Sequence, residues 1–225
     1  KCFAECTGLH SVTIPSTVSV IGDVCFDQCI LLSSVVIPTT VTKLGIGCFN
    51  KCIGMRAITI PGSVRVIDEA CFSKCYGMSS VSIPTSVTRI GSGCFNACVS
   101  LTSISLPDSV STMERSLVHS CERLQSISIP SSVTSIGNAC FYGCVSLKSL
   151  SLPVSVVAIG DSCFERMVQL ENIRMTDSVT SIGRDCFKEC TSLKSVTVPS
   201  LIGALSDRCF NKCVSLTSVS LPSGV

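Results

Sequence analysis

Tryptophan is absent from this 225-residue chain, which has only two tyrosines. Charged residues are also scarce, at 14% of the chain, and the formal net charge is +2. Proteins that bind nucleic acid usually carry a clustered basic face, so this charge balance argues against a nucleic-acid partner. No apolar run approaches the roughly 18 residues that a membrane-spanning helix needs. We therefore expect no nucleic-acid partner and no transmembrane segment.

The chain is equally poor in the groups that catalysis and cofactor binding require. His10 and His119 are its only histidines, so the many serines have almost no base beside them and a Ser-His-acid triad is not indicated. Neither a G-x-x-x-x-G-K-[ST] loop nor a G-x-G-x-x-G turn is present, and the single glycines that recur are typical of turns. We expect no enzymatic activity, no cofactor and no catalytic residue.

What the sequence does contain is one phrase repeated every 23 residues. It reads C-F-x-x-C-x-S-L-x-S-V-x-I-P-x-S-V-x-x-I-G-x-x, and no insertion or deletion interrupts it from Cys2 onwards. Positions are counted below from the first cysteine of each copy. A fixed period of this length predicts a solenoid, in which each repeat contacts only its neighbours. We predict a single array over residues 1–225, and because neither end resembles a polar cap we expect a fragment lacking both caps.

Each repeat divides into short predicted elements. Positions 10 to 12 alternate hydroxyl and apolar residues, which predicts a half-buried strand, and proline at position 14 ends it. Apolar residues at positions 17 and 20 predict a second crossing of the core, and glycine at position 21 predicts a turn. Positions 1, 2 and 5 of the Cys-Phe-x-x-Cys segment lie on one side of a single helical turn. Strands of successive repeats should stack in parallel about 4.8 Å apart.

The pattern L-x-x-[VI]-x-[IL]-P followed by S-V-x-x-I-G-x-x-C-F-x-x-C resembles the leucine-rich repeat family, specifically its BspA-like (Treponema pallidum-type) subclass of 23-residue repeats. The chain departs from that subclass by placing cysteine at position 1, where alanine is more common. The resemblance implies an α/β solenoid of about ten repeats, with a concave parallel β-sheet and short helical turns on the convex side. It also implies a surface-exposed adhesion or host-interaction protein of a bacterium or microbial eukaryote.

Eighteen cysteines would ordinarily suggest disulfides or a metal site. Here every cysteine occupies position 1 or 5, and the two exceptions at these positions are the apolar residues Leu117 and Met167. Pairing within repeats would leave Cys121 and Cys163 without partners, whereas a buried free cysteine packs as a small hydrophobe. Zinc sites more often show C-x-x-C spacing or histidine ligands. We therefore predict reduced core cysteines and no metal, which leaves an intracellular location open beside the cell-surface or secreted location that the resemblance implies.

Small hydroxyl residues form two columns, at positions 10 and 12, on the predicted exposed face of the strands. They either fit a tightly curved sheet or form a binding surface, although such a surface lacks the large anchors that dominate interface energies. Repeat eight loses its proline and places Asn172 and Arg174 at these two positions. We propose Glu171, Asn172, Arg174 and Asp177 as a candidate partner-binding patch, and drift within one repeat is the alternative explanation.

Repeat six also departs from the consensus, and we expect its His119 to be an exposed residue of a short helix. The departures in this repeat are Met113, Glu114, Arg115, Leu117, Val118, His119, Glu122 and Arg123.

Taken together, these patterns favour a non-enzymatic interaction or adhesion module of a microbial surface protein. Its partner would be a protein or a surface glycan, recognised through the repeat array. The alternative is a structural or scaffold subunit that docks within a large assembly through its convex face and lateral edges. Neither the partner nor the oligomeric state follows from the sequence.

Overall fold

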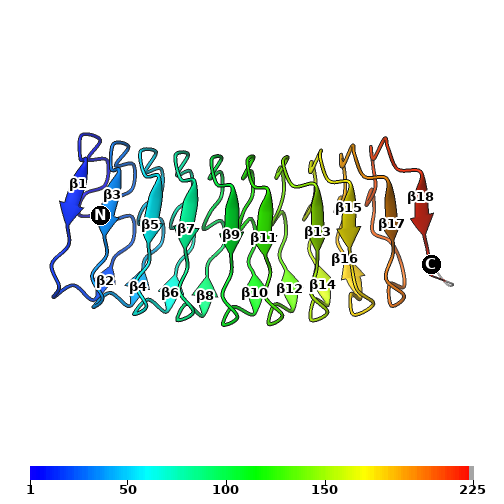
Figure 1. Ribbon diagram of the computed structural model, residues 1–225, viewed down its shortest axis with the longest axis horizontal. Coiled ribbons are helices and arrows are strands. Elements are labelled where there is room, and N and C mark those ends of the chain that lie inside the picture. Colours follow the sequence, from blue (N-terminus) through cyan, green and yellow to red (C-terminus); the bar gives the residue numbers. More distant parts are fainter. Residues whose placement is uncertain (223–225) are drawn as a thin grey trace.

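The computed structural model describes residues 1–222, which form a parallel β-solenoid of about nine turns with two rows of short strands (Figure 1). The long-strand row comprises β1 (Ser11–Thr13), β3 (Ser34–Val36), β5 (Ala57–Thr59), β7 (Ser80–Ser82), β9 (Ser103–Ser105), β11 (Ser126–Ser128), β13 (Ser149–Ser151), β15 (Asn172–Arg174), β17 (Ser195–Thr197) and β18 (Ser218–Ser220). The short-strand row comprises β2 (Val20–Ile21), β4 (Lys43–Leu44), β6 (Val66–Ile67), β8 (Arg89–Ile90), β10 (Thr112–Met113), β12 (Ser135–Ile136), β14 (Ala158–Ile159) and β16 (Ser181–Ile182).

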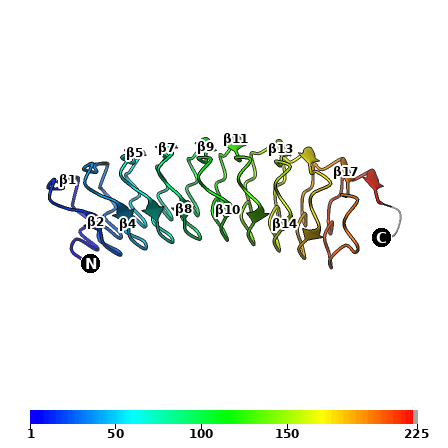
Figure 2. The same cartoon turned by 90° about the horizontal axis from the view of Figure 1, so that it is seen from below.

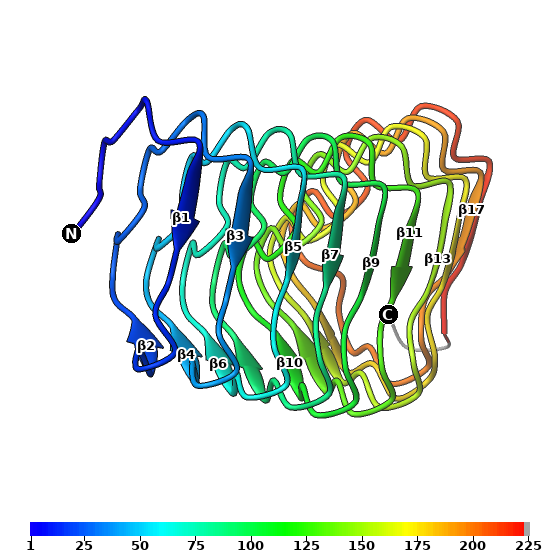
Figure 3. The same ribbon diagram turned by 60° about the vertical axis from the view of Figure 1, so that its left-hand side comes forward.

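Both rows keep the 23-residue register that the period predicts, since Ser11 pairs with Ser34 and Val20 pairs with Lys43. The rows are nevertheless interrupted. The long strands pair only two by two, as β1 with β3, β5 with β7, β9 with β11, β13 with β15, and β17 with β18. The short strands form two sheets of four, β2 to β8 and β10 to β16. Figure 1 shows the widest gap in the long-strand row between β11 and β13, and Figure 3 shows the long-strand row above the short-strand row.

The predicted helical turns, and with them the α/β class, are wrong, because residues 1–222 contain no helix. Alternate backbone N–H groups of the Cys-Phe-x-x-Cys segment instead donate to the next repeat, and those between them donate to a carbonyl three residues earlier. Phe26 N donates to Cys48 O at 2.8 Å, and Gln28 N donates to Asn50 O at 2.8 Å. Among the described residues, positive φ occurs only at positions 4 and 23, as at Gln28 and Gly47. An α-helix needs negative φ at every residue, so a segment with these two positions cannot form one.

The array bows gently in Figure 2, and the long-strand row runs along the outer edge of the bow. The concave position that the resemblance implied for this sheet is therefore wrong as well. Coils on the outer edge of a bow are further apart than coils on its inner edge. The interruptions in the long-strand row accord with that geometry, because strands must approach to about 4.8 Å to pair.

The core runs the whole length of the array between the strand rows and the Cys-Phe segments. Buried leucine, isoleucine and valine come from the strands, and the phenylalanines at position 2 stack in a column. Ring centroids of Phe26 and Phe49 are 5.3 Å apart with an interplanar angle of 7°. The column is interrupted at Val118, which is buried in repeat six between Phe95 and Phe141.

Most cysteines belong to this core, as the apolar exceptions predicted. Cys48, Cys52 and Cys71 have no exposed surface, whereas Cys2 and Cys6 in the first repeat are exposed. Position 5 has a further role, because its thiol donates to the position-2 carbonyl of the preceding repeat. Cys52 Sγ lies 3.2 Å from Phe26 O, and the same contact recurs along the column. Hydrophobicity alone would allow other small apolar residues at position 5. This weak hydrogen bond explains why cysteine, which can also donate, occurs there.

Thiol titration tests the reduced core. Burial raises the pKa of Cys121 and Cys140 to about 12, so these thiols are neutral and shielded at neutral pH. We expect the exposed Cys2 and Cys6 to react first with a thiol reagent in the native protein. In denaturant without reductant, all 18 thiols should react. A denatured count far below 18 would show disulfides and contradict this prediction.

Six of the nine residues at position 21 are glycines, and Asp68, Glu114 and Ser206 occupy the other three. Gly160 tests whether its lack of a side chain allows a close approach between coils. A Cβ on Gly160 would lie 2.6 Å from Asn138 N and 2.8 Å from Gly137 C. We expect Gly160→Ala to lower the free energy of unfolding by about 1–3 kcal/mol, seen as a lower urea midpoint.

Gly22 is the matched control, because it occupies the same position in the first repeat and a Cβ there would meet nothing within 4 Å among the described residues. Gly22→Ala should change stability by less than about 1 kcal/mol. Equal effects of the two substitutions would show that inter-coil contact is not the cause.

Candidate functional site

The structure places Asn172 and Arg174 on β15, with both side chains exposed on the long-strand row. β15 pairs with β13 in register, so Asn172 lies beside Ser149 and Arg174 beside Ser151. Arg174 makes no ion pair with any residue of the described part of the chain. Most other residues at these two strand positions are serine or threonine, so the long cation of Arg174 and the amide of Asn172 stand out on this face.

The other two residues of the predicted patch have partners in the next repeat. Glu171 Oε2 lies 2.8 Å from Lys194 Nζ, and this hydrogen bond lowers the pKa of the Glu171 carboxyl. Asp177 Oδ1 accepts the backbone N–H of Ser200 at 3.0 Å, which lowers the pKa of Asp177. Both carboxylates therefore help to join repeats eight and nine, and Asn172 and Arg174 remain available to a partner.

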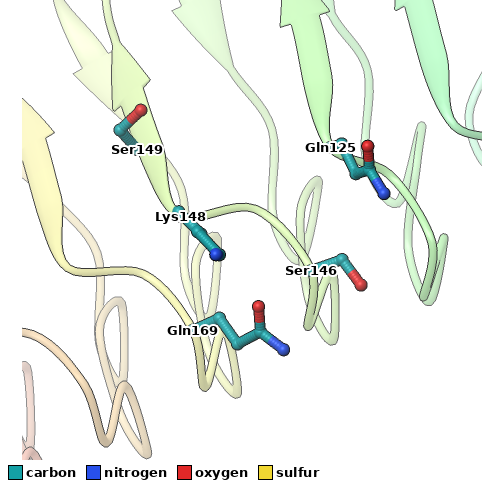
Figure 4. A pocket seen from close by; sticks show the side chains of 5 residues that line it. All are labelled: Gln125, Ser146, Lys148, Ser149 and Gln169. Atoms are coloured by element: carbon teal, nitrogen blue, oxygen red, sulfur yellow. The ribbon is translucent and has the colours of Figure 1, made fainter.

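Sequence reasoning missed a groove that borders this patch. It has a volume of about 530 Å³ and opens where β11 and β13 fail to pair. Its lining residues are Gln125, Ser146, Lys148, Ser149 and Gln169. Figure 4 shows the side chains of Gln125, Lys148 and Gln169 extending from neighbouring turns towards the same open side. The only signal in the sequence is that long polar residues replace Ser, Thr or Gly at positions 7 and 9 of repeats six to eight.

The interruption leaves main-chain groups open at this groove. At most junctions the N–H of position 9 donates to the position-9 carbonyl of the preceding repeat, as Gln125 N does to Thr102 O at 2.9 Å and Glu171 N does to Lys148 O at 2.8 Å. Lys148 N and Gln125 O make no such bond to any backbone group in residues 1–222. The groove thus combines a free donor and a free acceptor with amide, hydroxyl and ammonium groups.

Two smaller grooves lie at other interruptions of the long-strand row. One, of about 290 Å³, separates β3 from β5 and is more apolar, because Val36 replaces a hydroxyl residue there and is 80% exposed. The other, of about 490 Å³, separates β7 from β9 and has Asp108 on its rim. Neither has the set of long polar side chains found between β11 and β13.

Repeat six contributes to the core more than to this surface. Leu117 and Val118 are fully buried, and Met113, near the end of the preceding repeat, is nearly so. His119 is half-buried and stacks on Tyr142 at 4.6 Å, and burial lowers its pKa. The expectation of an exposed helical histidine is therefore wrong, because the segment is not helical and the ring packs between coils.

Three properties of the described residues concern metal ligation, thiol reactivity and membrane-spanning helices. Residues 1–222 contain no group of three or more His, Cys, Asp or Glu side chains placed to hold a metal. Burial raises the pKa of the core thiols, which makes them poor nucleophiles. The part of the chain that the structure describes also has no helix of the length and hydropathy that crossing a membrane requires.

Comparison with solved structures supports the fold. The chain is similar to a leucine-rich repeat protein from Bacteroides ovatus ATCC 8483, with 26% identity, a TM-score of 0.70, and coverage of 99% of this chain and 69% of that one. It is similar to the T. pallidum leucine-rich repeat protein, with 26% identity, a TM-score of 0.58, and coverage of 82% and 78%. A leucine-rich cell surface protein from Faecalibacterium prausnitzii A2-165 has 22% identity and a TM-score of 0.67, with coverage of 96% and 88%, which shows the fold alone.

Sequence comparison gives the family directly. No curated protein matches the chain. The family model described as the BspA-type leucine-rich repeat region, in six copies, matches residues 1–125 and 114–225 and so spans the whole array. The chain belongs to the BspA-type leucine-rich repeat family.

Proposed function

We propose that this chain is a non-enzymatic protein-interaction or adhesion module of a microbial surface protein, which recognises a macromolecular partner through the long-strand row. Membership of a repeat family typical of bacterial surface proteins supports the general function. One observation carries the site. Long polar side chains on this face gather near one groove of about 530 Å³. Lys148 lines it, and Asn172 and Arg174 lie on β15, where Asn172 is paired with the groove residue Ser149.

The binding surface extends over repeats six to eight. Gln125 and Lys148 line the groove beside β13. Asn172 and Arg174 lie on β15, which pairs with β13. The surrounding serines are short, so these longer side chains stand above them and reach a partner first. A flat hydroxyl face alone would bind weakly, and long polar residues beside a groove supply the local specificity that it lacks.

A scaffold role is the second candidate, and an apolar column along one lateral edge favours it. Position 6 carries the exposed side chains of Ile30, Ile53 and Tyr76 on successive repeats. An exposed apolar strip of this kind suits contact with a neighbouring subunit. In this alternative the lateral edge makes the contacts and the long-strand row is incidental.

Restoring the consensus on β15 tests the proposed surface. The chain, coupled to beads, is incubated with arrays of purified extracellular proteins and surface glycans, and saturable binding is measured. We expect the double variant Asn172→Ser and Arg174→Ser to weaken that binding by about tenfold or more, because Arg is among the residues that dominate interface energies.

Arg65→Ser is the charge-matched control, because Arg65 is exposed beside β6 in the short-strand row and its column is otherwise mostly Ser or Thr. It should leave binding unchanged. If the control and the double variant weaken binding equally, recognition does not pass through β15. If only substitution of Ile53 and Tyr76 abolishes binding, the scaffold role replaces the proposal.

A further inference from the structure

At the groove between β11 and β13 one backbone hydrogen bond between neighbouring repeats is missing. In a parallel sheet neighbouring strands exchange evenly spaced N–H···O=C bonds. Lys148 N and Gln125 O would complete this exchange between the two strands, and neither finds a backbone partner within residues 1–222. Both residues are exposed, so these two backbone groups are open to solvent and can pair with a ligand in its place.

A cation accompanies each such interruption. Arg56 N, at position 9 beside β5, also lacks the bond that its equivalents make within the described chain, and Arg56 and Lys148 are both cationic at this position. The junctions that keep this bond vary at position 9. Ser33, Ser79, Thr102 and Thr217 are small hydroxyl residues, whereas Gln125, Glu171 and the cationic Lys194 are long. A free N–H and an ammonium group on the same residue both attract an anion.

The charges around the groove leave it positive. Glu171, on the adjoining repeat, lies 2.8 Å from Lys194 and is also attracted by Lys148. Lys148 and Arg174 make no ion pair anywhere in residues 1–222. Gln125 and Gln169 add side-chain amides that can donate or accept. A ligand with carboxylates is therefore complementary to this surface.

Main-chain complementarity decides between two kinds of acidic ligand. A free N–H and a free C=O at one strand junction suit the peptide groups of an extended chain, which alternate donor and acceptor in the same way. An acidic glycan would use carboxylates and hydroxyls, and the groove has no exposed aromatic ring among its lining residues on which a sugar could stack. The observations therefore favour a peptide.

We propose that the groove between β11 and β13 binds an extended acidic peptide segment of a partner protein, with a carboxylate held by Lys148 and the main chain paired to Lys148 N and Gln125 O. This inference rests on the proposed function and names the class of partner for the same surface. Arg174 lies on the adjacent β15 and receives a further carboxylate of the same segment.

The experiment uses a fluorescein-labelled peptide of alternating glutamate and serine with the complete chain, and fluorescence anisotropy reports binding. We expect salt-sensitive, saturable binding. Lys148→Gln should weaken it about tenfold, as expected for loss of a charge-assisted hydrogen bond. Lys74→Gln is the matched control, since Lys74 is an exposed lysine of a Cys-Phe segment, and it should leave affinity unchanged.

A second arm separates main-chain pairing from charge alone. The same peptide with N-methylated serines keeps every carboxylate but loses backbone donors, and we expect it to bind several-fold more weakly. Binding of the unmodified peptide should also slow hydrogen exchange at the Lys148 amide. Equal affinity for the methylated peptide, or equal weakening by Lys74→Gln and Lys148→Gln, would overturn the proposal.

Two further outcomes decide the class of ligand and its relation to the proposed function. If oligogalacturonate, an acidic glycan, binds as tightly as the peptide, the peptide assignment is wrong. If the β15 double variant loses its macromolecular partner while Lys148→Gln retains it, the proposed function stands and this inference fails. If neither variant affects the macromolecular partner, both fail.

Discussion

Every coil of this molecule depends on hydrogen bonds to the coil one repeat away. A chain with this register cannot satisfy its backbone within a repeat, because each turn contains only two or three residues of strand in either row. Phe26 N to Cys48 O is typical of the bonds that replace local ones, and it recurs wherever the 23-residue phase is kept. The strict period follows, since one inserted residue would move every donor away from its acceptor.

The same constraint explains residues that hydrophobicity alone does not. Glycine at position 21 allows one coil to pass close to the backbone of the preceding one, as Gly160 does at Asn138. Residues with positive φ at positions 4 and 23 accompany the alternate N–H groups of the Cys-Phe segment that point to the next repeat, as Gln28 N does. The thiol of Cys52 adds a weak bond to Phe26 O, so a small side chain that can also donate is favoured at position 5.

The solenoid period, the family and the burial of most cysteines could be predicted from the sequence, because each depends on residue types that recur at the same position of all ten repeats. The backbone conformation of the Cys-Phe segment could not be predicted, because the apolar spacing of positions 1, 2 and 5 fits a helical turn equally well. What decides it is a hydrogen bond to the next repeat, such as Phe26 N to Cys48 O, which the local sequence does not reveal. Asn172 and Arg174 could be placed on the exposed face from alternation alone. The groove beside Lys148 could not, because its sequence period is unbroken and only the spacing of β11 and β13 reveals it.

The interruption at Val118 divides the molecule mechanically. Phenylalanine rings stack continuously from Phe3 to Phe95 and again from Phe141 to Phe210, and the short-strand row separates into its two sheets of four in the same middle region. In an array where repeats interact only with their neighbours, the weakest interface determines where the structure separates. A module anchored at one end and held by its partner at the other would therefore yield first at its centre, and each half would keep its own stack of rings.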